Sequence, residues 1–120
     1  MANTVLNVRG PEKLNAWKEF ETSASAFLKA VDSTSKQADF PISKDHKTLI
    51  MVKNTHGSAA KTATIKAGGG FRGGADVTVS IASGSTYCMQ VDSGFFKGSD
   101  GKVLIVGESA DIYAGAIELI

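Results

Sequence analysis

The sequence has few of the features that would assign it to a particular class of protein. It has one cysteine, Cys88, so an internal disulfide cannot form. Small secreted β-domains often rely on disulfides, and their absence favours a reducing compartment, or an assembly built in one. No cluster of Cys and His surrounds Cys88 in the sequence. We therefore interpret it as a small strand residue rather than a nucleophile or a metal ligand.

An excess of charge of one sign is also missing. The formal net charge is +1 at pH 7, and the 13 Lys and Arg are scattered along 120 residues. Domains that bind nucleic acid usually carry a clustered basic excess, so the composition disfavours such a partner. No apolar run approaches the roughly 18 residues of a membrane span. The start, MANTVLNVRG, lacks the apolar region of a signal peptide. We expect a soluble protein, made in the cytoplasm, with no membrane partner.

Proline is scarce and glycine is abundant. The chain has two prolines, Pro11 and Pro41, and thirteen glycines, most of them between strand-like runs. This composition is typical of a turn-rich sheet protein rather than a disordered chain. We expect an N-terminal arm over residues 1–10 and a single β-domain over residues 11–120, which is long enough to bury one core. Such an arm can lie on its own domain or add to a neighbour's sheet edge, and the sequence does not choose.

The stretch Lys47–Ile81 carries the strongest signal for the fold. Val77, Val79 and Ile81 alternate with polar residues, which is the period-2 pattern of a half-buried strand. The run KTATIKA alternates in the same way. The unbroken apolar centre of KTLIMVKN predicts a strand covered on both faces. Further strand-like runs are QADFPI (with Ala38, Phe40 and Ile42 on one face), TYCMQV, KVLIV (102–106) and ADIYAGAIEL (110–119).

Residues 12–32 are ambiguous, because Glu21 interrupts an otherwise helical spacing of apolar residues. We predict a short helix or turn near 12–19 and a strand near 26–32. Pro41 cannot donate a ladder hydrogen bond, so its strand should lie at an edge or end there. Strands recur about every ten residues, with turn signals between them and no βαβ spacing. The prediction is an all-β fold: a compact antiparallel sandwich or barrel of about seven to eight strands.

Motifs that carry chemistry are weak. Gly68, Gly70 and Gly73 match G-x-G-x-x-G, but a dinucleotide site needs a helix after the loop, and a strand is predicted there. We interpret this run as a hairpin loop. His46 and His56 flank one strand at opposite ends and cannot share a metal through it. Several aspartates lie beside turn residues or at strand edges, where Asp favours turns: Asp39, Asp45, Asp92, Asp100 and Asp111. A glycosidase site would need two of these carboxylates to converge. We expect no enzymatic activity, no cofactor and no metal.

Aromatic residues offer a second interpretation, in which flat rings form a platform for sugars. The candidates are Trp17, Phe71, Phe95 and Phe96. Adjacent strand residues face opposite ways, so one of Phe95 and Phe96 should lie outside the core. Phe71, within GGGFRGG, is the best candidate for an aromatic side chain held on a loop as a contact surface.

The C-terminal two-thirds of the chain resembles a group of small tailed-bacteriophage virion proteins, the head decoration (cement) proteins. The shared elements are a K-T-L-I-x-V-x-N strand, a T-x-T-I-K-A-G strand, a glycine-rich loop, a D-x-T-V-S strand, a G-K-V-L-I strand and a final A-x-I-E-L strand. In this chain they lie at Lys47–Asn54, Thr62–Gly68, Gly69–Gly74, Asp76–Ser80, Gly101–Ile105 and Ala114–Leu119. The first thirty residues match poorly.

This resemblance implies a non-catalytic structural protein that binds the exterior of an icosahedral head. The implied partners are the major capsid protein and two further copies of the chain in a homotrimer. We expect the capsid or subunit contacts to include Val5, Leu6, Val8, Phe71, Arg72, Phe95 and Phe96. The alternatives are a carbohydrate-binding or adhesion module and a ring-forming tail-tube or head–tail connector subunit.

Overall fold

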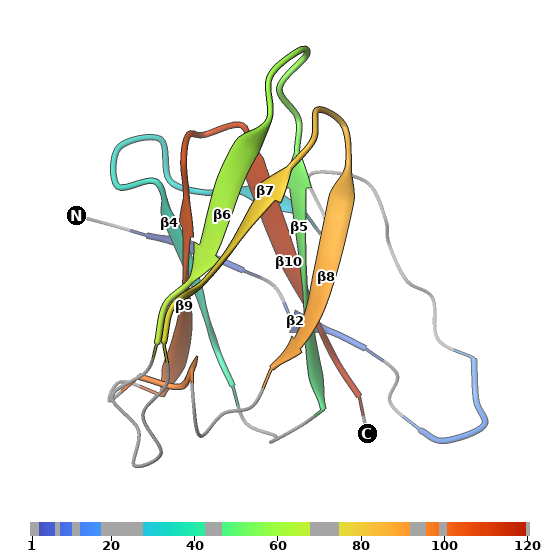
Figure 1. Ribbon diagram of the computed structural model, residues 1–120. Helices are drawn as coiled ribbons and strands as arrows, with labels where there is room; N and C mark the ends of the chain where they lie inside the picture. The colour runs from blue at the N-terminus through green and yellow to red at the C-terminus, as the bar shows by residue number, and fades with distance from the viewer. Residues whose placement is uncertain are drawn as a thin grey trace.

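The computed structural model describes residues 3–6, 8–10, 13–17, 28–42, 47–67, 75–91, 96–98 and 101–119. Figure 1 shows these residues as two facing β-sheets. Within the described ranges the strands are β1 (Thr4–Val5), β2 (Val8–Arg9), β3 (Lys29–Ala30), β4 (Gln37–Pro41), β5 (Thr48–Asn54), β6 (Lys61–Ile65), β7 (Val77–Ile81), β8 (Thr86–Val91), β9 (Lys102–Gly107) and β10 (Ile112–Glu118).

The strands form a sandwich rather than a closed barrel. The first sheet has the order β1-β4-β9-β6-β7, and the second has the order β2-β10-β5-β8, with β3 also paired with β10. All the pairs between long strands are antiparallel. The two-residue strands β1 and β2 pair in parallel with β4 and β10. The predicted all-β, mainly antiparallel sandwich is confirmed, and β4 to β10 are its seven strands of five or more residues.

The core lies between the two sheets and follows from the alternation of each strand. Ala38, Phe40 and Ile42 are all buried, as their shared face predicts. Ile50 on β5 and Ile105 on β9 come from opposite sheets and are also buried. At every second position along a strand, an apolar side chain is thus removed from water when the protein folds. This burial is the main stabilising contribution to such a fold.

The prediction that KTLIMVKN is covered on both faces is wrong. Along β5 the residues at positions 48, 50, 52 and 54 are buried, whereas Leu49, Met51 and Lys53 are only half-buried. The reason is that β5 lies within a two-layer sandwich, between β10 and β8 in its own sheet. Its inner face meets the first sheet, and the side chains on its outer face stay partly exposed.

The ambiguous region 12–32 is described in part. Lys13–Asn15 form a bend and turn, in which Asn15 has a φ of 59°, so the turn alternative holds there. The predicted strand near 26–32 is reduced to β3 over its described residues. The QADFPI strand was predicted to lie at an edge or to end at Pro41; the second alternative holds, since β4 ends at that residue and lies between β1 and β9.

The N-terminal segment lies on its own domain and crosses from one sheet to the other. β1 pairs with β4 in the first sheet, and β2 pairs with β10 in the second. Between them the Leu6 amide donates a hydrogen bond to the Asp39 carbonyl at 2.9 Å, and the Leu6 side chain is 3% exposed. This crossing covers the side of the sandwich formed by the β1 edge and the β2 edge.

Candidate functional site

The opposite side of the sandwich is formed by two edge strands, one from each sheet. β7 is the last strand of the first sheet, and β8 is the last strand of the second. A short turn over residues 82–85 connects them, and they run in roughly opposite directions (Figure 1). Among the described residues, no strand pairs with the outer side of either one. We call this side the β7/β8 edge.

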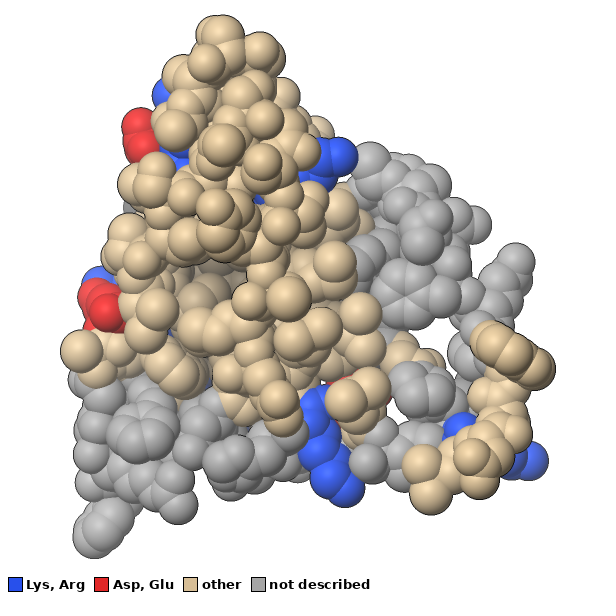
Figure 2. Space-filling view, turned by 45° about the vertical axis from the view of Figure 1, so that its right-hand side comes forward, with Lys and Arg blue, Asp and Glu red and all other residues tan. Residues whose placement is uncertain are grey.

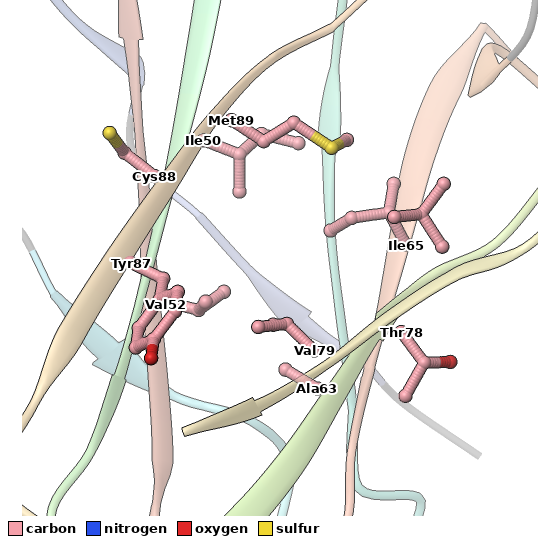
Figure 3. Close-up of a pocket in the computed structure, with 10 residues that line it drawn as sticks. Ile50, Val52, Ala63, Ile65, Thr78, Val79, Tyr87, Cys88 and Met89 are labelled. Atoms are coloured by element: carbon pink, nitrogen blue, oxygen red, sulfur yellow. The ribbon is translucent and has the colours of Figure 1, made fainter. Parts of the chain in front are cut away.

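An apolar cleft of about 320 Å³ opens between the sheets at the β7/β8 edge. Figure 3 shows that the Val52, Ala63 and Val79 side chains point into the space between the sheets, whereas Cys88 points away from it. On each edge strand one end is buried and the other is exposed. Ile81 on β7 and Val91 on β8 are buried, whereas Val77 on β7 and Tyr87 on β8 are 42% and 46% exposed. The residues that line the cleft are Ile50, Val52, Ala63, Ile65, Val77, Thr78, Val79, Tyr87, Cys88 and Met89.

The β7/β8 edge carries no charged side chain. Residues 77–91, which include both strands and their turn, contain no Asp, Glu, Lys, Arg or His. In a chain that is 21% charged, fifteen such residues in succession are unusual. Figure 2 shows the described part of this face as a broad surface with charged groups only toward its margins. The strand predictions did not single out this run, although the missing charges could have marked it.

An aspartate holds the start of β7 against the end of β6. Asp76 accepts a hydrogen bond from the Ala67 amide at 2.7 Å and another from the Lys66 ammonium at 2.6 Å. The Ala67 hydrogen bond, followed by the hydrogen bond to Lys66 and its positive charge, lowers the pKa of Asp76 below its usual value. Beside it, the Thr64 and Thr78 hydroxyls lie 2.8 Å apart across the strand pair. These contacts fix one border of the cleft.

A buried asparagine positions the turn that joins β7 to β8. The Asn54 side-chain amide donates to the carbonyls of Ala59 and Ile81, both at 2.9 Å. Its carbonyl oxygen accepts from the His56 amide at 2.9 Å. The Asn54 backbone also accepts from Gly84, whose φ of +77° suits glycine. The β5–β6 loop and the β7–β8 turn are thereby tied to one residue.

The sequence-predicted contact residues do not form one surface. Val5 is 56% exposed, whereas Leu6 is buried and Val8 packs against the core, so these two have contacts within their own domain. Phe96 is half-buried and also packs against the core. Phe71, Arg72 and Phe95 lie outside the described residues. The contact roles proposed for all seven stay predictions.

A second apolar surface lies on the turn over residues 13–17. Trp17 and Leu14 are 104% and 75% exposed, the two most exposed large apolar side chains described. Figure 1 shows this turn projecting from the body of the sandwich. Sequence reasoning singled out Trp17 as an aromatic but did not find Leu14, whose exposure depends on the turn. Exposed large apolar side chains on one short segment can mark a contact surface.

The titratable candidates are dispersed. Cys88 lies on β8 and is exposed, and His56 lies in the β5–β6 loop with its Nδ1 accepting from the amides of Ser58 and Ala59. Asp39 lies in β4 and Asp111 just before β10, whereas Asp45, Asp92, Asp100 and His46 lie outside the described residues. The described residues contain no group of three or more His, Cys, Asp or Glu suited to a metal ion. Nor do they contain a helix that could cross a membrane.

The glycine-rich run leads into a strand, as predicted. Residues 68–74 lie outside the described ranges, and the next element in the described part of the chain is β7 rather than a helix. A pyrophosphate site of the dinucleotide-binding kind needs a helix N-terminus after its glycine loop. The chain places a strand at that position instead.

Fold and surfaces together define a two-sheet antiparallel β-sandwich in which the described residues leave two apolar regions uncovered, the turn 13–17 and the β7/β8 edge. Comparison of the chain with protein-family models, with characterised proteins and with solved structures finds no match.

Proposed function

We propose that this protein is a virion structural protein that binds the outer surface of an icosahedral capsid and stabilises it without catalysis. It would be made in the host cytoplasm, act as a homotrimer and have the major capsid protein as its partner. The sequence resemblance of Lys47–Leu119 to head decoration proteins motivates the proposal. The observation that carries it is a β-sandwich with two separate uncovered apolar surfaces, because a decoration protein needs one for its own copies and one for the capsid.

The turn over residues 13–17 suits the capsid contact. Trp17 and Leu14 together offer an aromatic and an aliphatic side chain with almost no cover from their own domain. Tryptophan is enriched among the residues that dominate binding energy at protein interfaces. Val5, which is 56% exposed on the β1 edge, is a second candidate within the N-terminal part of the chain.

Many copies on one lattice would make individually modest contacts sufficient. A trimer that touches the capsid at three equivalent turns binds with a high effective concentration after its first contact. The trimer therefore gains affinity that a single turn of five residues does not supply. Because one rigid trimer would contact neighbouring capsid subunits, it would resist their separation within the lattice.

The test is co-sedimentation with empty expanded heads. Deletion of residues 1–10 would remove buried Leu6, so single substitutions at exposed sites are more informative. We expect Trp17→Ala to weaken binding by at least about tenfold, which is the effect of one interface anchor of more than 1 kcal/mol. Thr34→Ala, at an exposed position of another turn, is the control and should bind as the wild type does. Undiminished binding of Trp17→Ala would show that the turn is not the capsid contact. Failure of the wild type to bind heads would refute the proposed capsid-binding function.

The exposure of Trp17 also favours a second candidate, a carbohydrate-binding or adhesion module. Sugars stack on exposed indole rings through the same apolar and π contacts. Trp17 is the only tryptophan in the chain, so its fluorescence reports directly on this site. Quenching or a spectral shift on addition of capsular or cell-wall polysaccharide, with no affinity for heads, would support this function instead.

A further inference from the structure

The two lateral sides of the sandwich differ in how they are covered. On one side the N-terminal segment crosses from β4 to β10 and buries Leu6 between the sheets. On the other side the described residues place no such segment, and the apolar cleft opens between β7 and β8. The same interior that is sealed by a strand crossing on one side is accessible on the other.

The β7/β8 edge also lacks the usual protection of edge strands. Natural sheets shield their edges with charged side chains, proline, bulges or very short strands. β1 and β2, at the opposite edges, have two residues each. β7 and β8 have five and six residues, contain no charged residue and no proline, and pair with β6 and β5 in regular register. Such edges are suited to pairing with another strand.

The missing charges favour copies of this chain as the neighbours. At a rotation axis each residue is brought close to its own copies, so a charged side chain would meet the same charge. The uncharged run 77–91 removes that repulsion. Cores of interfaces between identical subunits are likewise depleted in charged residues and rich in apolar ones.

A second copy also matches the shape of the edge. Each copy presents one edge strand from each sheet, and β7 and β8 run in roughly opposite directions (Figure 1). β7 of one copy can therefore pair antiparallel with β8 of the next when the copies are related by an axis along the strands. Each such pair would extend over about 16–20 Å, at about 3.3 Å per residue.

We propose that the β7/β8 edge faces a threefold axis, where β7 of each copy pairs with β8 of the next. The three clefts then join into one apolar core on the axis, closed by Val77, Val79, Tyr87 and Met89 from each copy. The number of copies rests on the homotrimer of the proposed function, whereas the location of the contact rests on the edge itself. The cleft is incomplete in one chain and complete in three.

The first experiment measures mass in solution by sedimentation velocity and light scattering. The wild type should have three times the mass of the 12.5 kDa chain. Val77→Lys and Tyr87→Lys each place a charge at an exposed position of the cleft, where it does not need to be buried in the monomer. Either substitution should raise the protein concentration at which half of the trimer is dissociated by at least about 100-fold, because the interface then buries an unpaired charge.

The control is Thr34→Lys. Thr34 is exposed in the turn between β3 and β4, outside the β7/β8 edge and outside the residues expected to make capsid or subunit contacts. This variant should remain a trimer. A wild type that is monomeric or dimeric, or a trimer that Val77→Lys and Tyr87→Lys leave intact, would overturn the proposal.

A second measurement locates the axis with a label at the margin of the cleft. Cys88, the only cysteine, is exposed on β8 and is one of the lining residues, but its side chain points away from the space between the sheets (Figure 3), so a spin label can be attached there. Strand and sheet spacings place the three labels about 10–30 Å apart if β8 lies at the axis. A single distance in that range supports the arrangement, and a trimer whose labels are more than about 40 Å apart refutes it.

The experiments can refute the trimer contact at the β7/β8 edge and the capsid-binding function independently of each other. If the trimer forms and depends on Val77 but does not bind heads, the edge contact stands and the capsid function falls. If heads are bound by a monomer, the capsid function stands and the edge contact falls. An apolar ligand that binds the cleft of a monomeric protein would also refute the edge contact.

Discussion

At the scale of single residues, Asn54 has the most connections of any polar side chain in the described core. It is fully buried, yet its amide makes hydrogen bonds with the carbonyls of Ala59 and Ile81 and with the His56 amide. Buried polar groups are tolerated when all of these bonds are made, and they then select one arrangement of the chain. Asn54 therefore defines how the β5–β6 loop meets the end of β7.

We predict that Asn54→Ala lowers the free energy of unfolding by about 2–4 kcal/mol, because three partners lose a hydrogen bond inside the protein. Urea unfolding followed by circular dichroism measures this change. Asn3→Ala is the matched control, since Asn3 is only half-buried and makes one hydrogen bond with Asp39 and one with Ser35. Its cost should be below about 1 kcal/mol. Equal losses for the two variants would contradict the role assigned to Asn54.

At the scale of elements, the β6–β7 pair is closed by Asp76, whose ionised form accepts hydrogen bonds from Ala67 and Lys66. The pKa of Asp76 is lowered from 3.8, chiefly by the Ala67 amide. Because the pKa of Asp76 is lower in the folded state, the hydrogen bonds of its ionised carboxylate contribute to stability at neutral pH. This contribution is lost as the pH falls through the folded-state pKa, and protonation releases the start of β7.

We predict that the Ala67 amide resonance titrates with a midpoint below 3.8, because it reports the protonation of Asp76. Nuclear magnetic resonance over a pH series measures the midpoint. In Asp76→Asn the side chain no longer carries the charge, and the titration of this resonance should disappear. A midpoint at or above 3.8 in the wild type would show that the hydrogen bonds do not favour the ionised form.

The attachment of β2 to β10 depends on a glycine. A Cβ at Gly10 would clash with the backbone carbonyl of Glu118, so the backbones approach too closely for any side chain. Gly10 therefore permits the N-terminal segment to reach the second sheet after it crosses from the first. The sequence predicted an N-terminal arm that ends at residue 10, but not this close contact.

We predict that Gly10→Ala costs about 1–3 kcal/mol of stability, because the two backbones must separate. Thermal unfolding measures the loss, and limited proteolysis should cut the N-terminal segment faster. Gly57→Ala is the control, since a Cβ there meets nothing within 4 Å and the change should be within about 0.5 kcal/mol. A Gly10→Ala protein as stable as the control would mean that β2 does not depend on this approach.

At the scale of the whole molecule, the sandwich has one closed side and one open side. Within the described residues, the closed side is sealed by residues 3–6 and 8–9, and the open side exposes the cleft between β7 and β8. Closed barrels have no edges, but a two-sheet sandwich leaves four of them. In this protein two edges are covered by the short strands at the N-terminal crossing. The other two form the uncharged surface on which the proposed trimer rests.

The elements and the class of fold could be predicted from the sequence, because side chains alternate along a strand wherever one face is buried. Phe40 and Val79 each lie in a run whose period of two determines its face before any pairing is known. The Ser83-Gly84 pair lies in the described turn between β7 and β8, and the lack of βαβ spacing favoured antiparallel neighbours.

Only the tertiary structure decided which strands became edges and which predicted contact residues are accessible. Leu6 and Val5 are adjacent, yet one is buried and the other is 56% exposed, because Leu6 lies where the chain crosses between the sheets. β7 pairs with the strand that precedes it, but the position of β8 beside β5 comes from pairings between residues far apart in the chain, such as Thr48 with Val91. Local periodicity carries no information about such pairings, so the cleft and the uncharged edge beside it became visible only when both sheets were assembled.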